Sequence, residues 1–511
     1  MPTQLSSQSS LPLPPGPRPL PLLGNVHQAP PSHPWKQYHE WGKQYGPLVY
    51  LNMMGQSIVL LTTSSAAHEL LAKRGATFSD RAYLLRAQLA LKGTNTLLMS
   101  YTPRFKMHQK LEGFLLDQRA TQAYQHLQVL ESRQLLFDLL ESSNDQGIDC
   151  HKILERSTAS TLFMLNYGFR IKSAEDRNLQ TIHAIDDDFS DFFRIGSQPV
   201  DLLPFLNHLP TFVAPWKTKA EAHWKMQTGL HLPNLQRGID SPGWTAAKLA
   251  WDKVQKGELE FTFQDLALEF GTMIDAALDG TVETLAWFLI ACLTQDRGFV
   301  SKAQKELDEV VGRDRLPSFE DRPRLPHIGA ILEETLRWRP VGAGGVPHFT
   351  KPESTYNGYR IPANSLVIPV QWAINREEAM FGSDAEDFVP ERWFGAGTGH
   401  AEPAAAAFGF GRRTCPGRHF ARNSLWLSMA YILWAFNIKP ARDPKTGKTI
   451  QLDSTAAMDG LVMRPEAFKV VFESRDQTAK DWIQKEGYTY DEDVTPVLEQ
   501  IETDLKRRQV G

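Results

Sequence analysis

The feature that most constrains this chain is a single cysteine in a loop rich in glycine and arginine. Cys415 stands in the stretch FGFGRRTCPGR (408–418), among Gly409, Gly411 and Gly417. Glycine permits tight turns and a close approach of the backbone to a flat ligand. Pro416 and Gly417 favour the start of a helix directly after the cysteine, and a helix N-terminus stabilises a thiolate. The pattern indicates a cysteine held for metal ligation or nucleophilic chemistry. A cysteine packed in a glycine-rich turn is the alternative.

Composition narrows the setting of this loop. The chain has 511 residues, of which 42% are hydrophobic and 22% charged, as in a globular protein with a large core. Cys150, Cys292 and Cys415 are far apart and odd in number, so they predict no disulfide framework. The formal net charge of -4 gives no general attraction for nucleic acid. No linker-like stretch divides the chain, which favours one large domain.

No segment has the pattern of a membrane span or of a signal peptide. The longest apolar stretch, Leu285–Leu293, is far shorter than the ~20 residues that cross a bilayer. Residues 1–10 are polar and lack an apolar core segment. The chain is therefore expected to be soluble or peripherally bound.

Hydrophobic patterns predict a mainly α protein with a small β region. Between residues 64 and 339 apolar positions recur three and four apart, as in helices, and a further helix is expected over 418–436. Residues 46–63 and 356–370 have strand patterns around turn residues, the second with Asn-Gly. A Pro- and Gly-rich irregular stretch covers 381–416.

These textures divide the chain into three parts. Residues 1–34 form a proline-rich segment, which favours an extended conformation over a helix. Residues 35–474 are expected to form one large folded domain. Residues 475–511 are charged and are expected to form a surface tail.

The cysteine loop resembles the haem-binding signature of the cytochromes P-450, F-x-x-G-x-R-x-C-x-G. The five fixed positions of that signature are matched by Phe408, Gly411, Arg413, Cys415 and Gly417. The resemblance extends to a structural pair with the pattern E-x-x-R and to the arginine that joins it. The matching residues are Glu334 and Arg337 in EETLR and Arg392 in FVPERW. An i,i+3 charge pair alone is weak, but its order before the cysteine signature makes it specific.

The resemblance implies the cytochrome P-450 fold and a haem b whose iron is ligated by Cys415. A thiolate ligand favours cleavage of the O–O bond of dioxygen. The haem propionates need cationic or donor partners, because buried carboxylates are costly without them. By resemblance Arg413 is one partner, and His348 in GVPHFT stands where the family has another. A histidine at a strand edge is the alternative for His348.

An early helix departs from the family pattern. The family commonly has a Trp-x-x-x-Arg pair that reaches a propionate, whereas the matching stretch YTPRFKMHQKL has Phe105 and Gln109. Lys106, His108 and Lys110 are the candidates to replace the lost contact. Ordinary solvated side chains are the alternative for all three.

A second departure lies in the helix expected over 263–295, which resembles the family's helix above the haem. The family signature (A/G)-G-x-(D/E)-T-(T/S) aligns with Ala276, Ala277, Leu278, Asp279, Gly280 and Thr281. Gly280 therefore replaces the threonine whose hydroxyl steers protons in the family. Thr281 is rotated by about 100° from that position, and Thr284 shares its face one turn later. A water or a polar group of the substrate is a further replacement.

The same helix carries an acidic stripe of Asp275, Asp279 and Glu283, spaced by four residues. Like charges at this spacing disfavour a helix, more so when buried. Asp279 is expected to serve proton transfer or a salt bridge. Asp275, beside Ala276, is expected either to face the substrate and bind an amine or a hydroxyl, or to form a structural salt bridge.

Partners follow from the charge near the cysteine and from the resemblance. The basic side chains there are Arg412, Arg418, His419 and Arg422. They could dock an acidic electron donor, which the resemblance implies is an NADPH-dependent flavoprotein reductase, or simply be solvated and pair with propionates. The stretch PPGPRPLPLLGN resembles the hinge that follows the membrane anchor in microsomal members, which implies the cytosolic face of the endoplasmic reticulum. The anchor itself is absent from this sequence, which favours a truncated chain over an unusual member.

The function expected from these features is the oxidation of a small, largely apolar organic molecule by dioxygen. The resemblance is to fungal members that act on secondary metabolites as monooxygenases. Gly280 leaves open an oxidase-type reaction or a rearrangement without oxygen insertion. A haem-binding protein without turnover is a distant alternative.

Overall fold

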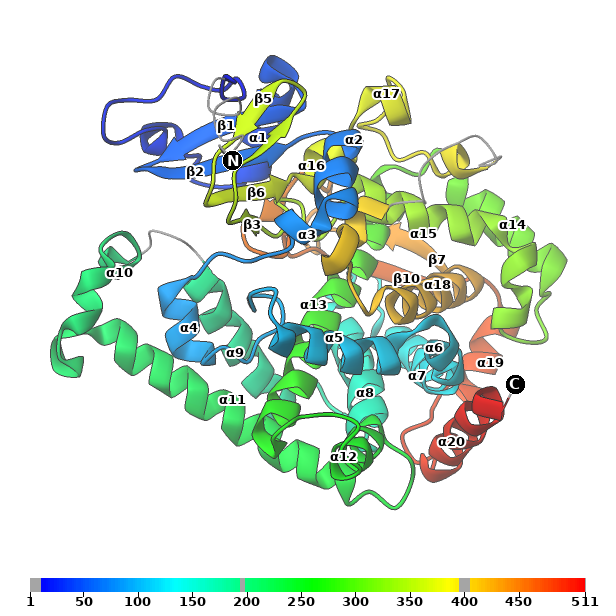
Figure 1. Ribbon diagram of the computed structural model, residues 1–511. Helices are drawn as coiled ribbons and strands as arrows, with labels where there is room; N and C mark the ends of the chain where they lie inside the picture. Colours follow the sequence, from blue (N-terminus) through cyan, green and yellow to red (C-terminus); the bar gives the residue numbers. More distant parts are fainter. Residues whose placement is uncertain (1–10, 194–197, 395–404, 511) are drawn as a thin grey trace.

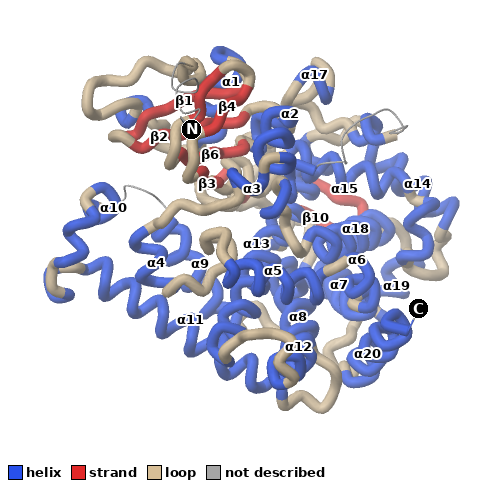
Figure 2. Tube along the Cα trace, viewed as in Figure 1, coloured by secondary structure: helices blue, strands red, loops and turns tan. Residues whose placement is uncertain are grey.

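The computed structural model describes residues 11–193, 198–394 and 405–510, and these form a mainly α protein with a small β region. Figure 1 shows helices over most of the molecule, and Figure 2 shows the strands gathered mostly at one end. The predicted fold class is therefore confirmed. The helices are α1 (Pro34–Tyr45), α2 (Ser64–Ala67), α3 (Gly75–Phe78), α4 (Leu85–Leu91), α5 (Pro103–Leu116), α6 (Gln118–Ala123), α7 (Gln125–Ser142), α8 (His151–Tyr167), α9 (Arg177–Phe193), α10 (Pro199–Leu202), α11 (Pro215–Ile239), α12 (Ala246–Gln255), α13 (Phe263–Thr294), α14 (Phe299–Val310), α15 (Pro326–Trp338), α16 (Gln371–Ile374), α17 (Glu378–Phe381), α18 (Arg418–Ala435), α19 (Gln477–Glu486) and α20 (Thr495–Val510).

The strands form one four-stranded sheet and three two-stranded ribbons. In the larger sheet the order is β1-β2-β6-β3, with β2 and β6 parallel and the outer pairs antiparallel. The ribbons pair β4 with β5, β7 with β10 and β8 with β9. The strands are β1 (Leu48–Met53), β2 (Gln56–Leu61), β3 (His348–Thr350), β4 (Ser354–Tyr356), β5 (Tyr359–Ile361), β6 (Ser365–Pro369), β7 (Phe436–Pro440), β8 (Ala457–Met458), β9 (Arg464–Pro465) and β10 (Val470–Ser474).

Both predicted hairpin regions form strands. Residues Leu48–Met53 pair in register with Gln56–Leu61, from Leu48 opposite Leu61 to Met53 opposite Gln56. The Asn-Gly turn joins β4 to β5, where Asn357 and Gly358 have φ angles of 49° and 77°. Positive φ at both central residues suits a two-residue hairpin turn, which explains the choice of Asn-Gly.

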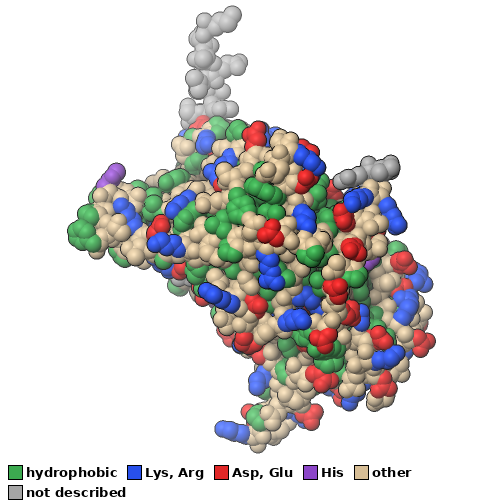
Figure 3. Space-filling view, turned by 90° about the horizontal axis from the view of Figure 1, so that it is seen from below, with side chains coloured by type: hydrophobic (Ala, Val, Ile, Leu, Met, Phe, Trp, Pro, Cys, Tyr) green, Lys and Arg blue, Asp and Glu red, His purple; other side chains and the backbone are tan. Residues whose placement is uncertain are grey.

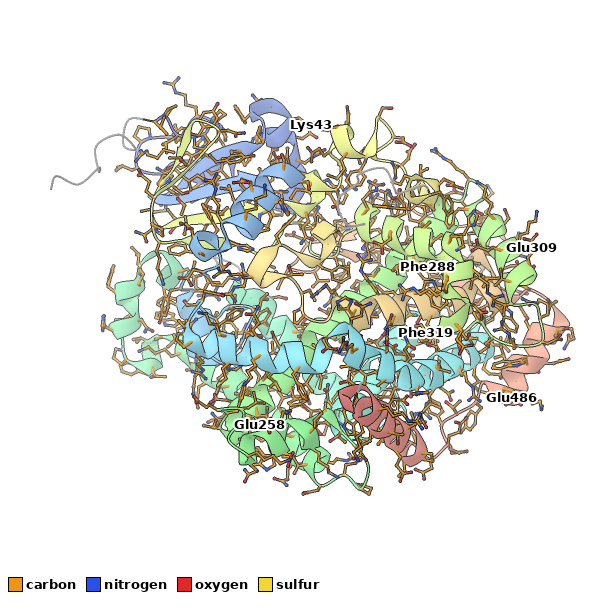
Figure 4. The ribbon with its side chains drawn as sticks, turned by 45° about the vertical axis from the view of Figure 1, so that its right-hand side comes forward. Lys43, Glu258, Phe288, Glu309, Phe319 and Glu486 are labelled. Atoms are coloured by element: carbon orange, nitrogen blue, oxygen red, sulfur yellow. The ribbon has the colours of Figure 1, made fainter. Side chains whose placement is uncertain are left out.

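Helix α13 runs through the centre of the molecule and positions the site. It begins at the N-cap Thr262, whose side chain accepts a hydrogen bond from the backbone N–H of Asp265 at 3.0 Å. Phe288, labelled in Figure 4, lies on its buried C-terminal half. Within the described ranges α13 is the one helix long and apolar enough to cross a bilayer, but most of that stretch is buried among other helices. Its hydrophobicity is therefore that of a core helix.

The C-terminal residues correct one prediction. Instead of a surface tail, they form α19 and α20, which pack on the helical body (Figure 1). Each helix buries one apolar stripe, with Ala479 and Ile483 on α19 and Leu498 and Ile501 on α20. The charged side chains of this region lie on the opposite faces of the two helices. The prediction of a tail relied on the high charge and overlooked the spacing of the apolar residues, which is that of amphipathic helices.

The proline-rich segment lies along the sheet from residue 11 onward. The carbonyl of Pro15 accepts a hydrogen bond from the Tyr50 backbone at 3.0 Å, and the carbonyl of Pro12 accepts one from Arg360 at 2.8 Å. Residues 1–10 of the predicted segment, and 395–404 of the predicted irregular stretch, lie outside the described residues. The boundary at residue 35 stays a prediction.

Candidate functional site

The cysteine loop is shaped by its backbone. The N–H of Cys415 donates to the carbonyl of Phe408 at 2.8 Å, which closes the loop. Gly411 has a φ of 59°, and a Cβ there would lie 2.2 Å from the carbonyl oxygen of Leu71. Glycine is therefore required at 411 by both conformation and space. Gly417 is the N-cap of α18, so the predicted helix start directly after the cysteine is confirmed.

Cys415 is a free thiol that needs a cation to ionise. Desolvation raises its pKa to about 11, whereas the backbone N–H groups of Gly417 and Arg418 act in the opposite direction. A metal ion that replaces the proton makes the thiolate stable. No group of three His, Cys, Asp or Glu side chains that could hold a metal ion occurs among the described residues. A single sulfur therefore fits a cofactor that brings its other iron ligands with it, as haem does.

Three basic side chains converge beside the loop: Arg81, Arg413 and His348. Arg413 donates from Nε to the carbonyl of Ser79 at 2.8 Å and from Nη2 to that of Met99 at 2.6 Å. Arg81 donates from Nη1 to the carbonyl of Pro347, next to His348, at 2.6 Å. The two guanidinium groups are thus fixed in place by backbone carbonyls.

This basic cluster carries more positive than negative charge. Burial, and then the charge of Arg413, lower the pKa of Arg81 to about 9. Burial also lowers the pKa of Arg413 to about 10. The nearby acidic groups are Asp80, which also pairs with Lys351 at 2.5 Å, and Glu112, whose pKa is raised well above its usual range by burial. A ligand with two carboxylates would compensate this excess, so the residues fit the propionates of a haem.

His348 is held in one orientation. Its Nδ1 lies 2.7 Å from the carbonyl oxygen of Phe78, so Nδ1 carries the proton. Burial, and then the charge of Arg81, lower its pKa well below the usual range. His348 can therefore donate from Nε2 to a carboxylate only as an imidazolium, which an adjacent propionate would favour.

Phe105 and Gln109 on α5, which replace the Trp and Arg of the family pattern, both contact the cysteine loop. Arg413 lies over the ring of Phe105, with its guanidinium carbon 3.7 Å from the ring centroid. Gln109 donates from Nε2 to the carbonyl of Arg412 at 3.0 Å. Phe105 and Gln109 thus hold the loop, a role that sequence reasoning missed.

The structure corrects the predicted substitutes on α5. His108 is fully buried, and its Nδ1 lies 2.8 Å from Oε2 of Glu269 on α13, because that buried carboxyl needs a polar partner. Lys110 lies about 140° around the helix axis from Phe105 and donates to the carbonyl of Glu258 at 3.0 Å. Lys106 lies over the ring of Tyr101. His108 and Lys110 thus make their contacts away from the basic cluster, whereas Lys106 shares the ring of Tyr101 with Arg413 but makes no direct contact with that arginine among the described residues.

Glu334, Arg337 and Arg392 meet in the interior between α15 and the short 3₁₀ helix Pro390–Trp393. Glu334 accepts from Arg337 at 2.7 and 2.8 Å and from Nε of Arg392 at 3.0 Å, and neither Glu334 nor Arg337 is exposed. The carboxylate of Glu334 also accepts from the Val389 backbone at 2.7 Å and from Nε1 of Trp393 at 3.0 Å. Arg337 in turn donates to carbonyls of the segment 375–387. This network connects α15 to the chain that leads to the cysteine.

The middle of α13 borders an open space. Ala276 is exposed although the helix around it is largely buried, and a Cβ added at Gly280 would meet no atom within 4 Å. The hydroxyl of Thr284 donates to the carbonyl of Gly280 at 2.7 Å, and Thr281 is buried. Neither hydroxyl thus stands in the space left by the glycine side chain.

The acidic stripe of α13 is partly neutralised. Asp279 accepts from Nη2 of Arg464 at 2.7 Å, and Arg464 lies 3.5 Å from Oε1 of Glu283. Oε1 of Glu283 is also 2.9 Å from Nε2 of His151, whose side chain is 38% exposed. The salt bridge expected for Asp279 is therefore present. Asp275 makes no hydrogen bond or ion pair with any described residue, and its Oδ1 is buried.

Sequence reasoning missed Arg81 and Arg464. Arg81 follows Asp80 in FSDRAYLLR, where a charged pair between apolar residues could have been singled out. Arg464 stands 185 residues from Asp279, and nothing in its local pattern indicates the contact.

The basic side chains beside the loop are largely engaged. Arg412 donates to the hydroxyl of Tyr101 at 3.3 Å, and Arg418 donates to the carbonyl of Cys415 at 3.2 Å. Arg422 is paired with Glu333. Of these, Arg412 is exposed. Figure 3 shows Lys, Arg, Asp and Glu side chains interspersed on another face of the molecule.

Comparison with known proteins places these features in one family. The family model described as cytochrome P450 matches residues 14–472. The chain is 35% identical to "Cytochrome P450 monooxygenase aneD" of Aspergillus aculeatus over 501 residues, which cover 96% of this chain and 94% of that protein. It is 34% identical to the "Echilunin cytochrome P450 monooxygenase" of Aspergillus ruber over 506 residues, covering 98% and 91%.

A solved structure shows the same fold. A zebra fish cytochrome P450, determined with abiraterone, superposes with a TM-score of 0.70 at 23% sequence identity. The match covers 87% of this chain and 100% of that one.

Proposed function

The chain belongs to the cytochrome P450 family, and from this premise we propose that Cys415 ligates the haem iron while Arg81, Arg413 and His348 bind the propionates. The protein is a haem-dependent monooxygenase of small organic molecules, similar to fungal enzymes. The observation that carries the residue roles is the arrangement of one free thiol on a closed loop beside two buried guanidinium groups. When bound, a thiolate-ligated haem supplies the activation of dioxygen, with electrons from NADPH through a redox partner.

The side chains of α13 would control protons above the haem. Asp279 is held by Arg464, and Glu283 extends the polar chain to the exposed ring of His151. These contacts link solvent to the turn of α13 that contains Gly280. Because Gly280 leaves space and offers no hydroxyl, the last proton donor in this proposal is a water or a polar group of the substrate in that space.

Turnover in heavy-isotope dioxygen tests this function. The haem-loaded protein is supplied with a reductase, NADPH and a small-molecule extract from its native source, and products are analysed by mass spectrometry. We expect one heavy oxygen atom in the product. A new product that forms only with NADPH and dioxygen but lacks the label would contradict monooxygenation and indicate oxidase-type chemistry.

Replacing Gly280 by Thr in the same assay tests the proton route. Because no atom lies within 4 Å of the added Cβ, the threonine should be accommodated without loss of folding. We expect the product formed per NADPH consumed to rise by more than about twofold, since a hydroxyl is restored, and less peroxide to be released. Gly280→Ala, which adds the Cβ without the hydroxyl, is the matched control. A fall in both variants would mean that the substrate itself fills this space.

We propose that the electron donor is a flavoprotein reductase that docks near the cysteine loop. The support is two basic residues that flank Cys415 in the sequence. Arg412 is exposed, and Arg418, at the start of α18, donates to the carbonyl of Cys415. An acidic face on the donor would complement these charges.

We further propose that the protein docks on the cytosolic face of the endoplasmic reticulum membrane. The connection between α10 and α11 exposes large apolar side chains, including Phe205 at 63% and Phe212 at 88%. Hydrophobic atoms gather at this end of the molecule, on the left of Figure 3. An exposed apolar patch of this kind is costly in water and suits a lipid surface.

Vesicle flotation tests the docking surface. The haem-loaded protein should float with phospholipid vesicles, and a double variant with Phe205→Ser and Phe212→Ser should bind at least about tenfold more weakly, because two apolar side chains are lost from the interface. Tyr488→Ser removes a side chain of 45% exposure near α19 and should leave flotation unchanged. Equal flotation of the double variant and the wild type would refute this surface.

A further inference from the structure

The open side of α13 has an acidic residue at its edge. Asp275 directly precedes the exposed Ala276 and stands one helical turn before Asp279. Ala276 and Gly280 border the open space described above. Asp275 is rotated by about 100° from Ala276, so its side chain is directed to one flank of this space and not straight into it.

Asp275 lacks a partner, and so does its neighbour Tyr167. Oδ1 of Asp275 is buried without a hydrogen-bond partner. The hydroxyl of Tyr167, a residue only 1% exposed, is likewise buried and without a partner. Burial, and then the charge of Asp275, raise the pKa of Tyr167, so the two side chains lie within electrostatic range of each other. Native proteins rarely leave two such groups unpaired, so their arrangement indicates a missing ligand.

The balance of charge identifies what kind of ligand is missing. Arg464 neutralises Asp279, and His151 pairs with Glu283. Asp186 on α9 lies within the electrostatic range of both Asp275 and Asp279. Neither Asp186 nor Asp275 forms an ion pair with a described residue. The charge of Arg464 also acts on Asp186, but the same guanidinium serves Asp279 and Glu283, so four carboxyl groups stand against Arg464 and His151.

The carboxyl groups of Asp275 and Asp186 hold their protons when no ligand is present. Burial, and then the charge of Asp279, raise the pKa of Asp275 to about 8. Burial, and then the charge of Asp275, raise the pKa of Asp186 well above its usual range. A cation that entered would take the place of a proton, and the proton would leave to solvent.

We propose that Asp275, assisted by Asp186, binds a positively charged nitrogen of the substrate. This inference rests on the proposed function and adds a substrate class to it: small organic amines with a protonated or quaternary nitrogen. A divalent metal ion is a poorer occupant, because it requires six or more oxygen ligands and two carboxyl groups stand here. A neutral hydroxyl would bind the protonated form of Asp275 and release no proton, so the pH dependence of binding distinguishes it from a cation.

Binding of a matched pair of probes tests this subsite. Phenyltrimethylammonium carries a fixed positive charge and cannot ligate iron through nitrogen, and tert-butylbenzene has the same shape without charge. Equilibrium dialysis against the haem-loaded protein, in sealed cells, measures both affinities. We expect the wild type to prefer the cation by at least about tenfold, and Asp275→Asn to abolish the preference by weakening only the cation. Asp145→Asn, which replaces an exposed acid in the turn after α7, should change neither affinity.

The pH dependence supplies a second readout. The probe itself does not titrate, so its affinity should fall about tenfold per pH unit below pH 8, where Asp275 becomes protonated, and level off above. In Asp275→Asn this slope should be reduced, and tert-butylbenzene should show none. Other titratable and charged groups near Asp275 also contribute to the slope of affinity against pH: Tyr167, Asp186, Asp279 and Arg464. A second set surrounds these groups: His151, His183, Asp187 and Glu283.

Three outcomes would overturn the subsite: no binding of the cation, equal binding of the two probes, or equal weakening of both by Asp275→Asn. Dialysis needs no turnover, so its result is independent of the reaction. The carbon monoxide spectrum of the reduced wild type tests thiolate ligation separately. A normal spectrum with no preference for the cation would refute the subsite and leave the proposed function intact.

Discussion

Cys415→Ala should abolish thiolate ligation of the haem and reduce turnover to background. The reason is that Cys415 is the free thiol on the closed loop, and the other two cysteines, Cys150 and Cys292, are buried on other elements. Alanine removes the ligand but fits the backbone, because Cys415 contributes to the loop through its N–H bond to Phe408. The measurement is the absorption spectrum of the reduced protein with carbon monoxide, read before any assay of activity.

Cys292→Ala is the matched control for this variant. Cys292 is a free cysteine on α13 that is only 6% exposed, and burial raises its pKa well above the usual range. Its replacement should leave the carbon monoxide spectrum unchanged, at a cost of about 1 kcal/mol in stability for the lost volume. A Cys415→Ala protein that kept the wild-type spectrum would refute the ligand assignment outright.

The parts of the site that lie close together in the sequence could be predicted from it. The loop around Cys415 is built from ten consecutive residues, and its glycines are required by local geometry that a pattern expresses directly. Glu334 and Arg337 are three residues apart on one helix, so their pairing follows from helical spacing. The acidic stripe on α13 was visible for the same reason.

The parts that depend on long-range packing could not be predicted. Arg81 meets Arg413 across more than 300 residues, and Arg464 reaches Asp279 from a short ribbon near the C-terminus. No periodicity connects such positions. The prediction that His108 binds a propionate was wrong because its ring is paired with the buried carboxyl group of Glu269 on another helix. Arg464 and His151, which are distant in the sequence, likewise determine which acids of the stripe form ion pairs and which do not.

Asp275 and Gly280 are two residues of α13 that are each unfavourable for folding, and they lie close together. A glycine weakens the middle of a core helix by about 1 kcal/mol, and an unpartnered acid is costly to bury. Both penalties fall within two turns of α13, at the open space beside Gly280 and on its flank at Asp275. Costs that collect at one site are expected where a ligand, rather than folding alone, compensates them.

Glu334→Gln should destabilise the protein by about 3–5 kcal/mol, because it leaves buried guanidinium groups without their carboxylate. Glu334 and Arg337 are both fully buried, and the same carboxylate holds Arg392 and the Val389 backbone. A loss of that size is a large fraction of the stability of a typical protein. The measurements are the midpoint of thermal unfolding of the haem-loaded protein and the yield of haem-loaded protein on expression.

Glu391→Gln makes the same chemical change in the short 3₁₀ helix Pro390–Trp393, next to Arg392, and serves as the control. Glu391 pairs with Lys302 at 2.5 Å, but both side chains are more than a third exposed. Water screens such a pair, so its loss should cost less than about 1 kcal/mol and leave haem loading unchanged. Each variant replaces one carboxylate by an amide. A difference in stability between the two variants therefore reports the effect of burial and not of the lost charge alone. If both variants unfolded at the same temperature as the wild type, the buried network would not be what holds the cysteine segment against α15. If both were equally destabilised, the pattern Pro390–Trp393 as a whole, rather than the buried carboxylate, would be the sensitive element.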